Sequence, residues 1–147
     1  MIFYIVRHGV TEWNTLKKVQ GAMDIPLAEE GILLARRTGE ALRDIPFDIC
    51  FSSPLKRARQ TAELILEPHS EKIPVVEDRR IQEIDFGVLE GSRFKDETGR
   101  VINEQMAVFF SGSGTFSETG AWGKYCRHLR TDAGVLAGKD SGSVFAG

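Results

Sequence analysis

The 147-residue chain has few of the residues from which metal centres and disulfide frameworks are built. Its two cysteines, Cys50 and Cys126, are far apart and show no metal-type spacing. The only histidines are His8, His69 and His128. We therefore expect neither a disulfide framework nor a zinc or histidine-rich metal centre.

The chain also has little net charge and no long apolar run. A formal charge of −2 gives no reason to expect a nucleic acid or an anionic membrane as a partner. No stretch approaches the length of a membrane span, and the N-terminus lacks the pattern of a secretion signal. With 41% hydrophobic and 27% charged residues, the composition is typical of a globular protein, which we expect to be cytoplasmic. The length predicts a single domain over residues 1–147.

What the chain does have is an alternation of apolar and amphipathic segments. Apolar runs predict strands at residues 1–6, 47–53 and 72–78, and the first is expected to be covered on both faces. Helical periodicity predicts helices at residues 28–43 and 53–67. This alternation predicts an α/β fold with right-handed crossovers and a mostly parallel sheet flanked by helices.

The periodicity also predicts the side chains on each helix face. In the first helix, one side is expected to hold Leu34, Thr38, Ala41 and Leu42. The second helix has Ser53 as a candidate N-cap. Its sheet-facing side is expected to hold Leu55, Ala58, Ala62 and Ile65.

Polar side chains follow the first two predicted strands. Arg7 and His8 come after the first, and Ser53 ends the second, with Arg57 in the first turn of the next helix. In an open parallel sheet, ligands bind beyond the carboxyl ends of the strands, and a helix N-terminus suits a phosphate. Guanidinium groups add bidentate donors, and a neutral histidine can accept a phosphoryl group. The residues themselves predict a phosphate pocket with a histidine in its floor.

Three motifs, "RHGVTEWN", "SSPLKRARQTAE" and "EIDFGVLEG", occur in order with "QGAMDIPLAEEGILLA" between the first two. Over roughly residues 1–110, the sequence resembles the histidine phosphatase superfamily and its phosphoglycerate mutase-like branch. The resemblance implies a three-layer α/β sandwich. It implies that His8 is the nucleophile and that Arg7 and Arg57 hold the phosphoryl oxygens. It also implies that Glu83 is the general acid and later the base, against the alternative of a solvated loop carboxylate.

The resemblance places further residues near the substrate. Asn14 and the Gln20–Gly21 pair are implied to lie near the phosphate or the body of the substrate. Thr11 could hold a substrate oxygen, although a capping or turn role is an equally good interpretation. The Lys17–Lys18 pair could attract an anion, although a solvated loop pair is commoner. No metal or organic cofactor is implied.

The superfamily's fourth motif, an apolar strand ending in a second histidine, is missing. His128 in "YCRHLR" lacks that context, and His69 in "EPHSEK" is interpreted as part of a surface loop. Eight of the fifteen glycines lie in residues 111–147, which we expect to be an atypical tail produced by a frameshift or truncation. "GVLAG" or "GSVFAG" within this tail could partly replace the missing strand. Otherwise an exposed sheet edge would make a homodimer plausible.

Three functions remain open. The favoured one is a phosphomonoester hydrolase that acts through phosphohistidine on a small phosphorylated metabolite. A phosphoglycerate mutase-type transferase would need longer loops to exclude water from the intermediate. The third is a catalytically impaired phosphate-binding or interaction protein that lacks the second histidine.

Overall fold

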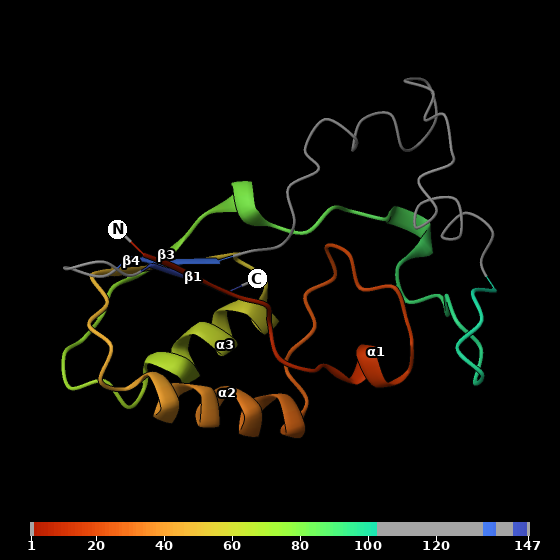
Figure 1. Ribbon diagram of the computed structural model, residues 1–147. Helices are drawn as coiled ribbons and strands as arrows, with labels where there is room; N and C mark the ends of the chain where they lie inside the picture. Colours follow the sequence, from red (N-terminus) through yellow and green to blue (C-terminus); the bar gives the residue numbers. More distant parts are fainter. Residues whose placement is uncertain (1, 103–133, 138–142, 147) are drawn as a thin grey trace. The chain divides into compact units, whose positions relative to one another are not determined.

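The computed structural model describes residues 2–102, 134–137 and 143–146 (Figure 1). Its strands are β1 (Phe3–Val6), β2 (Ile49–Ser52), β3 (Val75–Glu77), β4 (Gly134–Ala137) and β5 (Ser143–Ala146). Its α-helices are α1 (Glu12–Thr15), α2 (Glu29–Leu42) and α3 (Lys56–Leu66). Two short 3₁₀ turns, η1 (Arg79–Ile81) and η2 (Gly87–Leu89), follow β3.

The chain forms two compact units. The first comprises Met1–Glu12, Asp24–Glu83 and Arg130–Gly147, and the second comprises Trp13–Met23 and Ile84–Leu129. The first unit contains the sheet with α2 and α3, and the second contains the loops after α1 and around η2. A single domain over the whole chain stays a prediction. Most of the predicted atypical tail lies outside the described residues.

The sheet has five strands in the order β3-β2-β4-β1-β5, with a further pairing between β2 and β5. β2 runs parallel to β3, and β1 runs parallel to β5 and antiparallel to β4. The predicted α/β fold class is therefore confirmed. The two short segments that were named as candidates to replace part of the missing strand contain β4 and β5, and both of these strands pair with β1.

Helix α3 confirms the face predicted from its sequence. The side chains of Leu55, Ala58, Ala62 and Ile65 are all buried. The helix begins at Lys56 and its N-cap is Leu55, so the expected cap at Ser53 is wrong. The Ser53 hydroxyl instead accepts a hydrogen bond from the Leu55 N–H at 3.4 Å, within the turn that leads into the helix.

Helix α2 buries a different face from the one predicted. Its buried residues are Gly31, Ala35 and Gly39, whereas the Leu34 residue is 53% exposed. The reason is a close helix contact: a Cβ on Gly39 would lie 2.7 Å from the Ile65 carbonyl oxygen of α3. Small residues let the two backbones approach, so the apolar pattern of large residues did not mark the contact face.

The described helices α2 and α3 lie together on one face of the sheet (Figure 1). On that side, Tyr4 and Val6 of β1 pack against a buried cluster that includes Phe47. The alternate residue Ile5 points to the other face and is 68% exposed. The expectation that β1 is covered on both faces is therefore wrong for the described residues. The side chains of β1 are apolar on both faces, so the sequence pattern could not show that one face is exposed.

Candidate active site

The His8 side chain follows the carboxyl end of β1, and its protonation pattern is fixed by a neighbouring carbonyl. The His8 Nδ1 atom lies 2.7 Å from the carbonyl oxygen of Gly9. Because a carbonyl oxygen only accepts, Nδ1 carries the proton and donates this hydrogen bond. In the neutral ring, Nε2 therefore keeps its lone pair, which is the form that a nucleophile needs.

The surroundings of His8 keep the ring neutral. The pKa of His8 is lowered from 6.5 to about 4, and burial of the ring is the largest cause. The bond to the Gly9 carbonyl partly opposes this change, whereas the positive charges of Arg57 and Arg7 contribute to it. At neutral pH the Nε2 lone pair is therefore available, and two guanidinium groups act electrostatically on the same ring.

A buried threonine connects the His8 loop to α3. The Thr61 hydroxyl accepts a hydrogen bond from the Gly9 N–H at 3.0 Å and donates one to the Arg57 carbonyl oxygen at 2.7 Å. Thr61 is only 2% exposed. It therefore holds the backbone of Gly9, whose carbonyl oxygen orients the His8 ring, against the same helix turn that carries Arg57. Sequence reasoning missed Thr61, although its position four residues after Arg57 places it on the inner face of α3.

Close backbone packing holds the His8 loop from its other side. A Cβ on Gly9 would lie 2.9 Å from the Gly31 carbonyl oxygen, and a Cβ on Gly31 would overlap the Val10 backbone. The Val10 carbonyl oxygen also accepts a hydrogen bond from the Ala28 N–H at 2.9 Å. The first turn of α2 and the loop after β1 thus contact each other without intervening side chains.

The predicted anion-binding groups differ in burial. Arg57 is 1% exposed, and Ser52 and Ser53 at the end of β2 are fully buried. Because a low-dielectric environment strengthens charge interactions, a bound anion would interact more strongly with Arg57 than with a surface cation. Arg7 is exposed.

Thr11 is fully buried, and its backbone forms an antiparallel bridge with Leu27. The Leu27 N–H in turn donates to Gln60 Oε1 at 2.9 Å. These contacts give Thr11 a place in the structure of the turn. They favour the turn interpretation over the substrate-binding one.

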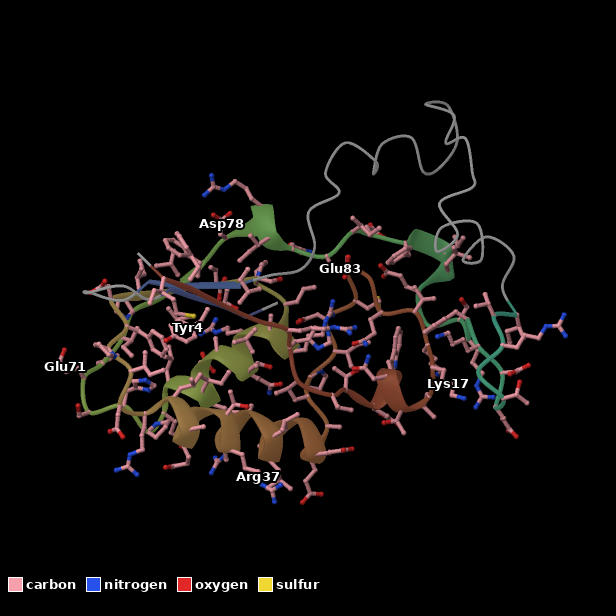
Figure 2. The ribbon with its side chains drawn as sticks, viewed as in Figure 1. Tyr4, Lys17, Arg37, Glu71, Asp78 and Glu83 are labelled. Carbon is pink, nitrogen blue, oxygen red and sulfur yellow. The ribbon has the colours of Figure 1, made fainter. Side chains whose placement is uncertain are left out.

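Glu83 lies in the segment that follows β3 and η1, and it is half-buried (Figure 2). Beyond β3, the Asp78 N–H donates to the Ser52 carbonyl oxygen at 2.9 Å, which attaches this segment to the end of β2. The Asp78 side chain caps η1, and hydrogen bonds from Arg80 lower the pKa of Asp78 to about 2. The Arg80 guanidinium is therefore paired with the Asp78 carboxylate of the same loop.

The remaining predicted residues, Asn14, Gln20 and Gly21, belong to the second unit. Within it, Lys17 Nζ donates to the carbonyl oxygens of Asp96 at 2.8 Å and Glu97 at 3.1 Å. Lys17 therefore has a structural role in holding a neighbouring loop, which neither of the two interpretations of the lysine pair anticipated.

Three further observations concern the remaining histidines, metals and membranes. His69 lies in the loop after α3, as expected, and it is half-buried there against the ring of Phe47, with centroids 5.3 Å apart. His128 lies outside the described residues. Residues 2–102 and the two C-terminal strands contain no group of three or more metal-ligating side chains. Within this same part of the chain, no helix is long and apolar enough to cross a membrane.

Comparison with known proteins decides the family. The profile of the histidine phosphatase superfamily (branch 1) matches residues 3–130. The chain belongs to this superfamily. The match confirms the resemblance seen in the motifs and extends it beyond residue 110.

Curated relatives of this chain include proteins named as a phosphatase and as phosphoglycerate mutases. The chain is 46% identical over 96 residues to the uncharacterized phosphatase PhoE of Bacillus subtilis, covering 65% of this chain and 49% of PhoE. It is 38% identical over 105 residues to the 2,3-bisphosphoglycerate-dependent phosphoglycerate mutase 2 of Gloeobacter violaceus, covering 71% and 48% of the two chains. The chain thus spans about half the length of the curated relatives it matches.

Solved structures of the same fold resemble this chain. The phosphoserine phosphatase of Entamoeba histolytica, in complex with 3-phosphoglyceric acid, is 39% identical with a TM-score of 0.61. That match covers 82% of this chain and 58% of the other. A phosphoglycerate mutase from Bacillus anthracis is 34% identical with a TM-score of 0.57, covering 63% and 42%. The phosphoglycerate mutase-like fold is therefore confirmed.

Proposed function

We propose that this protein is a phosphomonoester hydrolase that acts through a phosphohistidine intermediate on a small phosphorylated metabolite. The single observation that carries the proposal is the state of His8. Its Nδ1 proton is engaged by the Gly9 carbonyl oxygen, and its pKa is lowered to about 4 by burial and then by Arg57 and Arg7. A neutral, oriented imidazole beside two guanidiniums suits attack on a phosphoryl group.

The proposed reaction has two steps. In the first, His8 Nε2 forms a bond to phosphorus as the bond from phosphorus to the ester oxygen breaks, and Glu83 gives its proton to the departing alkoxide. In the second, Glu83 takes a proton from water, and the water oxygen bonds to phosphorus as the bond from phosphorus to His8 Nε2 breaks. Inorganic phosphate leaves, and both His8 and Glu83 return to their starting states. Arg7 and Arg57 stabilise the negative charge of the transferring group in both steps.

Hydrolysis of a generic aryl phosphate tests the proposal, with His8→Ala as the matched control. We expect phosphate release by the wild-type chain to exceed that of the His8→Ala variant by at least about 100-fold, since the covalent route is lost. Rates that are equal in the two proteins would refute the proposed hydrolase.

A mutase is the second candidate, because relatives named phosphoglycerate mutase match this chain at 38% identity. The two reactions share the first step and differ in whether water or a second hydroxyl receives the phosphoryl group. We favour the hydrolase because a relative named as a phosphatase, PhoE of Bacillus subtilis, matches this chain at a higher identity of 46% over 96 residues. Labelled phosphohistidine at His8 that transfers to an added hydroxyl compound, without release of phosphate, would favour the mutase.

An impaired binding protein is the third candidate, because no motif for a second pocket histidine was found in the sequence. Loss of one charged group from a phosphate pocket lowers turnover more than it lowers phosphate affinity. Titration with phosphate or vanadate separates this case from the hydrolase. Tight binding without hydrolysis would favour the impaired protein.

A further inference from the structure

The carboxylate of Glu90 joins two segments of the second unit that are far apart in the sequence. Its Oε1 atom accepts hydrogen bonds from the Ala22 N–H at 2.7 Å and from the Phe86 N–H at 3.0 Å. Ala22 directly follows the Gln20–Gly21 pair. Phe86 comes three residues after Glu83. One oxygen atom therefore links the Gln20–Gly21 segment, which is expected near the substrate, to the segment that follows the proposed general acid Glu83.

The backbone around Glu90 is shaped to admit this carboxylate. Gly21 is buried and has a positive φ of 52°, a conformation that favours glycine. A Cβ on Gly21 would overlap Glu90 Oε1 and would lie 2.8 Å from the Phe86 ring. Glycine is thus required at position 21 both by its backbone angle and by the space that the Glu90 carboxylate and the Phe86 ring occupy.

Backbone hydrogen bonds continue the same junction beyond Glu90. The Gly91 N–H donates to the Val19 carbonyl oxygen at 2.9 Å, and the Val19 N–H donates to the Ser92 carbonyl oxygen at 3.0 Å. Val19 packs with the buried Leu89 side chain beneath these bonds. Glu90 therefore contributes side-chain hydrogen bonds to a junction that is otherwise formed by backbone hydrogen bonds and a small apolar cluster.

We infer that Glu90 is a positioning residue for the reaction: its carboxylate holds the Gln20–Gly21 segment and the loop after Glu83 in one fixed arrangement. The inference rests on the proposed function, in which Glu83 protonates the leaving group. A negatively charged oxygen is well suited to this position, because charge-assisted hydrogen bonds from two N–H groups are stronger than neutral ones. A shift of about 1 Å in a catalytic group can cost about 100-fold in rate.

The test compares substrates that differ in how much they need a general acid. A dinitrophenyl phosphate has a leaving group that departs without protonation, whereas an alkyl phosphate such as glycerol phosphate needs a proton. For Glu90→Leu, we expect kcat/KM to fall about 100-fold on the alkyl phosphate and less than about 5-fold on the dinitrophenyl phosphate. Glu90→Gln keeps a carbonyl oxygen at the same place and should retain the wild-type ratio between the two substrates. Glu83→Gln should show the same split as Glu90→Leu.

Hydrogen exchange shows whether the junction itself depends on Glu90. We expect the amide protons of Ala22 and Phe86 to exchange at least about 10-fold faster in Glu90→Leu than in wild type, and to remain protected in Glu90→Gln, because both donate to the same oxygen. If the leucine variant does not fold, Glu90→Asp replaces it. Its carboxylate is one methylene shorter and cannot reach both N–H groups.

The outcomes separate this inference from the proposed function. A uniform loss on both substrates in Glu90→Leu, or no loss, overturns the role of Glu90, while a selective loss in Glu83→Gln leaves the hydrolase mechanism in place. If Glu83→Gln shows no dependence on the leaving group, the proposed role of Glu83 is wrong. A wild-type chain that hydrolyses neither substrate overturns both the proposed function and the catalytic importance of Glu90.

Discussion

Replacement of Thr61 by valine removes one hydroxyl from beneath the proposed nucleophile and keeps the shape of the side chain. The hydroxyl now accepts from the Gly9 N–H at 3.0 Å and donates to the Arg57 carbonyl oxygen at 2.7 Å. Arg57 is on the same helix, so its carbonyl keeps other contacts within α3. The Gly9 N–H loses its partner at a site where Thr61 is 2% exposed. A buried donor left without a partner costs about 1–3 kcal/mol.

The expected loss can be read by thermal unfolding and by kinetics. For a chain of this length, 1 kcal/mol corresponds to about 2–4 °C in Tm, so Thr61→Val should lower Tm by about 2–12 °C. The Gly9 carbonyl orients the His8 ring, so a loosened Gly9 peptide should also lower kcat/KM by about 10-fold or more. Thr61→Ser keeps the hydroxyl and should preserve most of the activity.

A second threonine provides a matched control. The Thr38 hydroxyl of α2 also donates to the carbonyl four residues earlier, Leu34, at 3.0 Å, but this bond is at the surface. Thr38→Val should change the free energy of unfolding by less than about 0.5 kcal/mol. If Thr61→Val behaves like Thr38→Val in both Tm and kcat/KM, the idea that Thr61 fixes the His8 loop is refuted.

Three further predictions concern other parts of the molecule. Because the pKa of His8 is lowered from 6.5 to about 4, the folded state binds fewer protons than the unfolded state between these pH values. The free energy of unfolding should therefore fall as the pH drops from 6.5 to 4, and it should fall less in His8→Gln. Unfolding measured at each pH tests this prediction. Both ring nitrogens of His69 are buried without a hydrogen-bond partner among the described residues. His69→Phe should therefore leave Tm unchanged or raise it, and a fall of more than about 4 °C would contradict this. Ile5 is 68% exposed and alternates along β1 with Tyr4 and Val6, which pack against the buried cluster. If the exposed face supports a homodimer, Ile5→Lys should shift the chain to monomer in sedimentation, and an unchanged mass would count against a dimer through this face.

The sequence predicted the elements of the first unit because their signals are local. The inner face of α3 was predicted correctly because Ala58, Ala62 and Ile65 recur at helical spacing and no other interaction competes with their burial. The contact face of α2 was missed because it consists of Gly31, Ala35 and Gly39, whose value lies in the closeness that they permit. Such a face is evident only when the partner backbone is known.

For the candidate site, the location could be predicted from the sequence, but the contacts that support it could not. Its placement after β1 and β2 follows from the rule that ligands bind at the carboxyl ends of strands, which requires only the order of elements. The supports for the site could not be predicted, because they depend on pairs far apart in the sequence. Thr61 bonds to Gly9 across 52 positions, and Glu90 bonds to Ala22 across 68. Nothing local to either residue identifies its partner.

The most direct test of the central claim is to find the atom that becomes phosphorylated. The wild-type chain is mixed with a phosphorylated substrate and quenched rapidly in alkali, which preserves phosphohistidine. Mass spectrometry then locates the phosphoryl group, and NMR distinguishes the two ring nitrogens. We predict phosphorylation at Nε2 of His8, because Nδ1 is engaged with the Gly9 carbonyl oxygen. Phosphorylation at Nδ1, or at a different residue with His8 unmodified, would contradict the account.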